Sequence, residues 1–123
     1  MRISSMMSPT IVLKDNRPEI VLGSGGSNRI RTAILQVISN IIDFKMPVDV
    51  AVNSPRVHWE NNVFNLEPGF SEESIKALLP SPSKLILWNK KNMFFGGVHT
   101  VMESEGVISS AGDERRNGAL AQN

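Results

Sequence analysis

The sequence contains no cysteine, which excludes disulfide bonds and thiol chemistry. No apolar stretch approaches the roughly 18 residues that a membrane-spanning helix needs, and the first five residues carry no apolar core of a signal peptide. A charge excess is also missing, because 13 basic and 12 acidic residues leave a formal net charge of +1. Since no run of Lys or Arg exceeds two residues, nucleic acid is not expected as the main partner.

These absences leave the compartment open. We expect a cytoplasmic location if the chain is complete, while a longer parent could be periplasmic or extracellular. At 123 residues the chain is long enough for a single modest core. We therefore expect residues 1–123 to form one domain.

Apolar spacing predicts the order of the elements along the chain. Two short apolar runs flank residues 14–18, which are typical of a turn, and so predict a β-hairpin. Leu35 and Ile42 widen the apolar stripe of the helix that follows, as expected for a helix covered on more than one side. The stripe itself is formed by Ile30, Ala33, Ile34, Val37, Ile38 and Ile41.

The remaining elements are shorter. A helix over residues 49–52 precedes two strands at 57–59 and 63–66, and another helix is expected from Ser71 through Leu79. Strands at both ends of the chain with helices between them indicate an α+β fold. The last strands are expected at 85–88, 94–103 and 107–110, with a polar, irregular tail over 111–123.

Glycine and serine at residues 23–26, with the sequence GSGG, stand directly before the long helix. Ser27 or Asn28 is the expected N-cap of that helix. Free backbone amides at a helix start, together with the helix dipole, suit an anion or a developing negative charge. The alternative is a strand-to-helix turn in which glycine only provides tight geometry. This segment alone does not decide between them.

Other polar residues give weaker signals. His58 and His99 are far apart and lack metal-ligand spacing, so no metal or other cofactor is expected. His58 beside Trp59 is expected to be hydrogen-bonded and partly buried.

Two further groups remain open as contacts for a carboxylate. Arg115 and Arg116 near Asp113 could clamp one, although a solvated tail with ion pairs is the default expectation. Ser4 and Ser5 precede the first strand and could donate hydrogen bonds to a ligand carboxylate. Exposed serines at a chain start would have the same sequence.

Read together, these segments resemble the γ-glutamyltransferase family. The resemblance lies in a serine pair before MSPTIV, in GSGGSNRI opening a helix, in AVNSPRVHWE, in LEPGF and in SSAGDERRNGAL. It covers essentially the whole chain. The sequence departs from the family pattern in an extra methionine after the serines, in a glycine loop without proline, and in Gly112-Asp113-Glu114 where the family usually has Ser-Asp-Pro.

The resemblance implies part of an N-terminal nucleophile hydrolase, a four-layer α/β/β/α sandwich made as a self-cleaving precursor. It places the chain in the C-terminal part of the small subunit, downstream of the catalytic threonine. Thr10, Thr32 and Thr100 do not match that motif. The implied partners are the missing N-terminal part of the small subunit and the large subunit, with a γ-glutamyl peptide or glutathione as substrate.

The resemblance also assigns roles to four residues. Ser4 and Ser5 would hydrogen-bond the α-carboxylate of the γ-glutamyl group, and the backbone amides of Gly25 and Gly26 would form the oxyanion hole. The chain alone is expected to be inactive, and an uncovered apolar face would favour self-association. The alternatives are a catalytically inactive stand-alone domain that binds a partner or a γ-glutamyl compound, and a truncated product with no function of its own.

Overall fold

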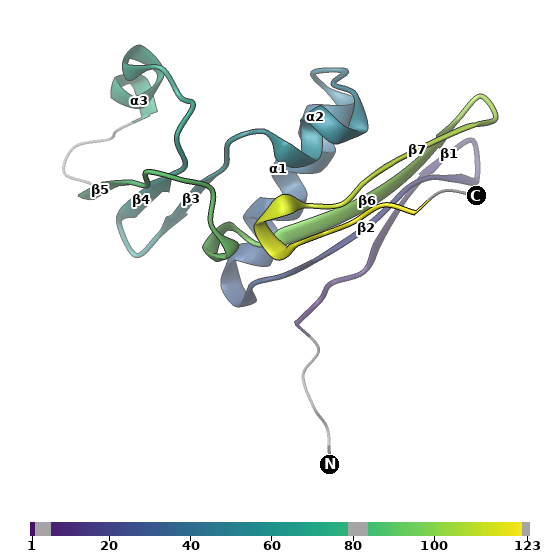
Figure 1. Cartoon of the computed structure of the whole chain (residues 1–123), viewed down its shortest axis with the longest axis horizontal. Helices are drawn as coiled ribbons and strands as arrows, with labels where there is room; N and C mark the ends of the chain where they lie inside the picture. Colours follow the sequence, from purple (N-terminus) through teal and green to yellow (C-terminus); the bar gives the residue numbers. More distant parts are fainter. Residues whose placement is uncertain (2–5, 79–83, 122–123) are drawn as a thin grey trace.

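The computed structural model describes residue 1, residues 6–78 and residues 84–121 (Figure 1). The chain is a mixed α+β structure. Its strands are β1 (Thr10–Lys14), β2 (Arg17–Gly25), β3 (Val57–Glu60), β4 (Val63–Leu66), β5 (Lys84–Leu87), β6 (Gly97–Ser104) and β7 (Val107–Ala111). Its helices are α1 (Ile30–Ile42), α2 (Val48–Asn53) and α3 (Glu72–Leu78), with 3-10 turns η1 (Ser27–Arg29), η2 (Met93–Phe95) and η3 (Glu114–Arg116).

The larger sheet is antiparallel and has the strand order β1-β2-β6-β7. The predicted hairpin of β1 and β2 is confirmed, and its two turn residues, Asp15 and Asn16, both have positive φ. Asp and Asn tolerate that conformation, which matches the twist of a hairpin. At the other end of β2, Gly25 pairs with Gly97 at the start of β6.

Helices α1 and α2 pack on one face of this sheet and enclose the core (Figure 1). The predicted α1 stripe is confirmed. Leu35 is 65% exposed and Ile42 is 37% exposed, so α1 is covered on one side only within the described part of the chain. The core residues of α1 are Ile30, Ala33, Ile34, Val37 and Ile41, and they meet Ile20, Leu22 and Val98 of the sheet.

The opposite face of the sheet carries apolar side chains that remain exposed in the described part of the chain. Successive strand residues point to opposite faces, so the neighbours of the buried Ile20 and Leu22 point outward. We call this surface the outer sheet face. Its exposed members are Ile11, Leu13, Val21, Val101 and Ile108.

A smaller sheet, β3-β4-β5, lies at the other end of the molecule (Figure 1). Its strands β4 and β5 are parallel, and α3 belongs to their connection. Trp88 stacks on Phe94 with ring centroids 5.0 Å apart, and the Arg29 guanidinium lies 4.7 Å from the Phe94 centroid. This cluster attaches the small sheet to the start of α1.

Three predictions about local structure are wrong. Residues 23–25 are the end of strand β2 rather than a loop. Neither Ser27 nor Asn28 caps α1, because the 3-10 turn η1 precedes the helix. Gly26 is the N-cap of η1, Arg29 is the N-cap of α1, and neither element has a side-chain cap. The strand expected from residue 94 begins at Gly97, since η2 occupies residues 93–95.

No described helix is long and apolar enough to cross a membrane.

Candidate functional site

Four glycines meet where β2 ends and β6 begins, and we call Gly25, Gly26, Gly96 and Gly97 the glycine corner. A Cβ on Gly26 would lie 3.2 Å from the Gly96 Cα, and one on Gly96 would lie 2.7 Å from Ser24 Oγ. Gly26 has φ 133° and Gly96 has φ 82°, which side chains disfavour. The corner therefore requires glycine for both space and backbone conformation.

Ser24 holds the two sides of the corner together. Its hydroxyl accepts a hydrogen bond from the Gly97 amide at 3.1 Å and donates one to the Gly25 carbonyl at 2.8 Å. Among the described residues, the Gly26 amide has no hydrogen-bond acceptor, whereas the Gly26 carbonyl accepts from Arg29 N at 3.2 Å. The corner thus presents a backbone donor just before the turn that begins α1.

A groove of about 710 Å³ runs along the outer sheet face beside the glycine corner. Gly25, Gly97, His99, Arg116 and Leu120 are among the residues that line it. Ser4 and Ser5, the predicted carboxylate contacts, lie outside the described residues. Their described neighbour Met7 lies beside the corner, because its carbonyl accepts a hydrogen bond from Ser24 N at 3.0 Å.

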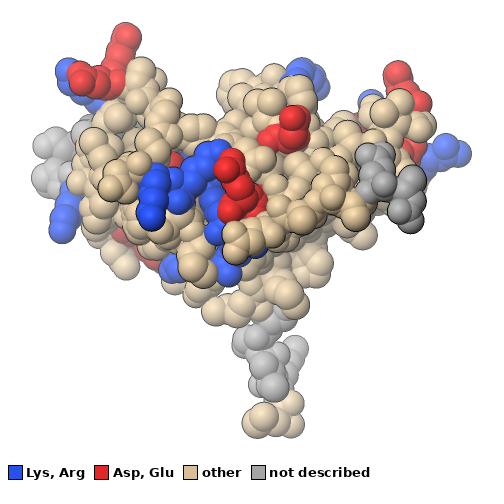
Figure 2. Space-filling view, in the orientation of Figure 1, with Lys and Arg blue, Asp and Glu red and all other residues tan. Residues whose placement is uncertain are grey.

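Arg116 extends across the glycine corner. A Cβ on Gly97 would lie 2.5 Å from Arg116 Cδ, and one on Gly25 would lie 3.4 Å from its guanidinium carbon. Nη2 of Arg116 donates to the Met93 carbonyl at 3.4 Å, and Nε is buried without a described partner. Basic side chains gather beside η3, the C-terminal turn that carries Arg116 (Figure 2).

Behind the corner lies a cluster of four buried charges, Arg56, Glu67, Asp113 and Arg115, which we call the charge quartet. All four are at most 7% exposed. Arg56 Nη2 lies 2.7 Å from Asp113 Oδ2, and Arg115 Nε donates to Glu67 Oε1 at 2.8 Å. Arg115 Nη1 also reaches Asp113 Oδ1 at 3.2 Å, so the ion pairs form one network.

The network favours the charged forms of Asp113 and Arg115. Burial alone would raise the pKa of Asp113, but Arg56 and the amides of Val98 and Arg115 outweigh it, so the pKa lies below its usual value. Burial lowers the pKa of Arg56, with Asp113 opposing the shift. For Arg115, burial is outweighed by Glu67 and Asp113, and the pKa is raised.

The quartet also fixes the backbone on both sides of the corner. Arg56 Nη1 donates to the Phe95 carbonyl at 3.0 Å, and the Val98 amide donates to Asp113 Oδ2 at 2.8 Å. These contacts flank Gly96 and Gly97 directly. Breaking a buried ion pair by removing one partner is strongly destabilising, so each member supports the position of the glycines.

The default expectation of a solvated tail is wrong for Asp113 and Arg115. Asp113 is fully buried and Arg115 is 7% exposed. The reason is that their partners, Arg56 and Glu67, come from segments far away in the sequence. All four quartet residues lie within the motifs that resemble the family: Arg56 in AVNSPRVHWE, Glu67 in LEPGF, and Asp113 and Arg115 in SSAGDERRNGAL. The order of these motifs along the chain did not show that the residues form ion pairs.

The prediction for His58 is confirmed in its hydrogen bonding, and the ring is more buried than expected. It is 4% exposed, and Nδ1 lies 2.8 Å from Thr32 Oγ1. Within residues 6–78 and 84–121, no three His, Asp or Glu residues gather in a way that could hold a metal ion.

The sequence of the chain is similar to those of known proenzymes. The chain is 39% identical over 114 residues to the glutathione hydrolase proenzyme of Escherichia coli, covering 90% of this chain and 19% of that protein. It is 31% identical over 118 residues to the acylase ACY 1 proenzyme of a Pseudomonas species, covering 95% of this chain and 21% of that protein. The chain thus spans about a fifth of the length of these curated relatives.

Solved structures agree in fold. The transpeptidase enzyme CapD of Bacillus anthracis superimposes with a TM-score of 0.82 at 30% identity, over 100% of this chain and 74% of that one. A mutant γ-glutamyltranspeptidase of Helicobacter pylori gives a TM-score of 0.78 at 34% identity, over 94% of this chain and 63% of that one.

The mixed α+β architecture and these neighbours define a partial region of an N-terminal nucleophile hydrolase, as expected from the sequence. The family described as gamma-glutamyltranspeptidase matches residues 1–123. The chain belongs to that family.

Proposed function

We propose that this chain forms the oxyanion and carboxylate contacts of an enzyme that cleaves or transfers γ-glutamyl groups. The observation that carries the proposal is the glycine corner. It aligns Gly25 and Gly26 at the end of β2, and the Gly26 amide has no described acceptor before the turn into α1. Backbone amides fixed before the reaction stabilise a developing oxyanion without reorganising.

The nucleophile is a threonine supplied by a separate segment. Its hydroxyl oxygen bonds to the γ-carbonyl carbon, and the carbonyl oxygen becomes an oxyanion that accepts hydrogen bonds from Gly25 and Gly26. Collapse of this intermediate breaks the carbon–nitrogen bond, and the amine leaves with the proton that the threonine hydroxyl gave up on attack. Water or an acceptor amine then cleaves the acyl-enzyme ester, and Ser4 and Ser5 hold the α-carboxylate throughout.

The exposed outer sheet face indicates that a partner segment packs against this chain. Its apolar side chains, including Val21 and Val101, are each 47% exposed in this chain. A sheet with one apolar face uncovered gains stability by packing against a second layer. We infer that the threonine-bearing part of the small subunit and the large subunit cover this face and form the other wall of the groove beside the glycine corner, with glutathione or a γ-glutamyl peptide as substrate.

The sharpest test removes one hydrogen-bond donor without changing the backbone. Proline is unsuitable at position 26 because its φ is near −65°, whereas Gly26 has φ 133°. Glycolic acid in place of Gly26 replaces the amide with an ester. In the complex with the threonine-bearing part, kcat on a γ-glutamyl anilide should fall by roughly 10²- to 10³-fold.

The same ester exchange at Gly106, where a Cβ would meet nothing within 4 Å, is the matched control. In a second arm, the double change Ser4→Ala and Ser5→Ala should raise KM more than it lowers kcat, because carboxylate contacts exist in ground and transition states alike. Unchanged kcat in a folded Gly26 ester would contradict the oxyanion role, and unchanged KM would contradict the serine role. A complex with no turnover would favour a binding domain.

A further inference from the structure

The groove beside the glycine corner has a one-sided charge. Among the described residues that line it, Arg116 is the only Lys or Arg, and there is no Asp or Glu. The remaining lining is mostly apolar or small, as at Val21, Val101 and Leu120. A cation in an otherwise uncharged groove matches a ligand with one anionic group.

The Arg116 side chain packs against the glycines of the corner. The stem of Arg116 lies on Gly97, where a Cβ would come within 2.5 Å of Cδ. Its Nη2 would lie 3.8 Å from a Cβ on Gly26, and its guanidinium carbon 3.4 Å from one on Gly25. The guanidinium therefore lies beside Gly25 and Gly26, whose amides are proposed to bind the reacting carbonyl.

Arg116 differs from the other two arginines of this region in its partners. Arg56 and Arg115 are both paired with buried carboxylates. Arg116 has no described carboxylate within 4.0 Å, and its Nε is buried without a described acceptor. A partly desolvated guanidinium with unused donors is stabilised by an incoming carboxylate, which can accept two parallel hydrogen bonds.

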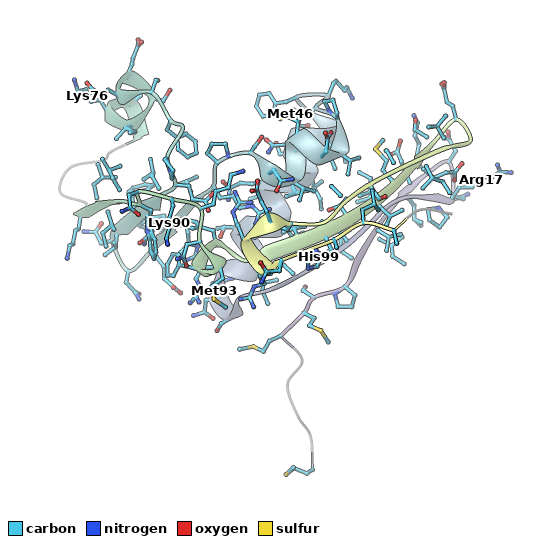
Figure 3. The ribbon with its side chains drawn as sticks, viewed as in Figure 1. Arg17, Met46, Lys76, Lys90, Met93 and His99 are labelled. Carbon is cyan, nitrogen blue, oxygen red and sulfur yellow. The ribbon has the colours of Figure 1, made fainter. Side chains whose placement is uncertain are left out.

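His99 adds a second donor to the same groove (Figure 3). Its Nδ1 accepts a hydrogen bond from the Asp113 amide at 3.2 Å, so the neutral ring carries its proton on Nε2. His99 is two residues from Gly97 on the same face of β6, about 6.7 Å along the strand. The His99 imidazole therefore lies close to Gly97, against which the Arg116 side chain packs.

We propose that Arg116, with His99 beside it, binds a carboxylate of the substrate and makes the groove specific for carboxylate-bearing compounds. This deepens the proposed function and rests on it. The carboxylate could belong to the acyl group or to the departing amine. Both have the same chemistry, and the substrates below distinguish them.

The kinetic test uses the complete protein, with this chain and its threonine-bearing part together. Arg116→Gln should raise KM about ten- to a hundredfold for substrates with the recognised carboxylate and change kcat little, because hydrogen bonds to charged groups contribute about 1.5–3 kcal/mol. Arg116→Lys should recover part of the loss. Arg17→Gln, at the hairpin end of the sheet (Figure 3), is the control and should change neither constant.

Two substrate pairs locate the carboxylate. A glutaryl anilide against a butyryl anilide tests the acyl side, and a γ-glutamyl anilide with and without a ring carboxylate tests the amine side. The pair whose preference disappears in Arg116→Gln identifies the source. If Arg116→Gln affects charged and uncharged members of both pairs equally, the proposal is wrong.

A second readout does not need turnover. Phenylglyoxal modifies arginine, and peptide mass spectrometry measures the rate at Arg116 itself. L-Glutamate should slow modification of Arg116 and leave Arg17 unchanged. Protection in a protein without γ-glutamyl turnover would support the carboxylate site while contradicting the proposed function, and turnover without protection would overturn the carboxylate site alone.

Discussion

Asp113 shows how one side chain joins three segments. It is fully buried, yet Oδ2 accepts from Val98 N and Arg56, and Oδ1 accepts from the amide and the guanidinium of Arg115. All four lone-pair directions of the carboxylate are used, which is the condition under which a buried charge is tolerated. The carboxylate can therefore remain ionised in the interior.

Asp113 should make stability depend on acid. Its folded pKa is below the ordinary 3.8, so the unfolded chain binds the proton first. The stabilisation is fully present above pH 3.8 and is lost as the pH falls through the lower folded value. Asp113→Asn should lower the free energy of unfolding by about 3–5 kcal/mol at pH 7 and flatten its decline below pH 3.8.

Urea unfolding from pH 7 downward measures both effects. Glu114→Gln is the matched control, since Glu114 is 61% exposed and, among the residues the structure describes, its carboxylate pairs only with Lys91 at the surface. It should change stability by less than about 0.5 kcal/mol. If both variants keep the acid dependence of the parent chain, Asp113 is not its source.

At the scale of elements, the accuracy of the sequence predictions followed the range of the interactions. Helix α1 was predicted because its apolar spacing is local, and the β1–β2 hairpin because its turn residues are contiguous. Residues 23–25 were predicted as a loop because glycine and serine suggest one. They are a strand because they pair with Gly97, Val98 and His99, more than seventy positions away.

The candidate site divided in the same way. The family resemblance predicted Gly25 and Gly26 as site residues, and the structure places the two next to each other at the glycine corner. Spacing alone did not reveal the buried state of Arg115, because its partner Glu67 lies 48 residues earlier. It also did not reveal that Gly96 and Gly97 complete the corner, since their role depends on the approach of β2.

The one-sided burial of α1 gives a prediction at this scale. Ile41 is 4% exposed and Leu35 is 65% exposed on the same helix. Ile41→Ala should cost about 2–5 kcal/mol, because it leaves a cavity in the core. Leu35→Ala should cost less than about 0.5 kcal/mol in the isolated chain.

Chemical denaturation of the two variants measures the difference. Equal losses in the isolated chain would mean that the Leu35 side of α1 is also covered. A larger Leu35→Ala effect in the complete protein would place a further segment on that side of the helix.

The whole molecule has a covered face and an uncovered one. The core is closed by α1 and α2, while Ile11, Val101 and Ile108 on the outer sheet face are between 47% and 60% exposed. An apolar sheet face of this kind is a site of association. The outer sheet face therefore determines whether the isolated chain associates in solution.

The isolated chain should self-associate or require its partner segment for solubility. Val21→Thr with Val101→Thr keeps β-branched side chains in the strands but adds hydroxyls to the outer sheet face, so it should shift the chain toward monomer. Sedimentation velocity across a concentration series measures this. A parent chain that sediments as a single monomer at all concentrations would contradict the prediction.

The charge quartet also constrains the order in which the molecule can be made. During synthesis, Arg56 and Glu67 leave the ribosome first, and Arg115 follows Glu67 by 48 residues. Until that last segment emerges, Arg56 lacks its partner Asp113 and Glu67 lacks its partner Arg115, so both charges remain hydrated. The core around Phe95 and Val98 therefore cannot close progressively from the N-terminal side, and folding is completed only when the C-terminal turn arrives.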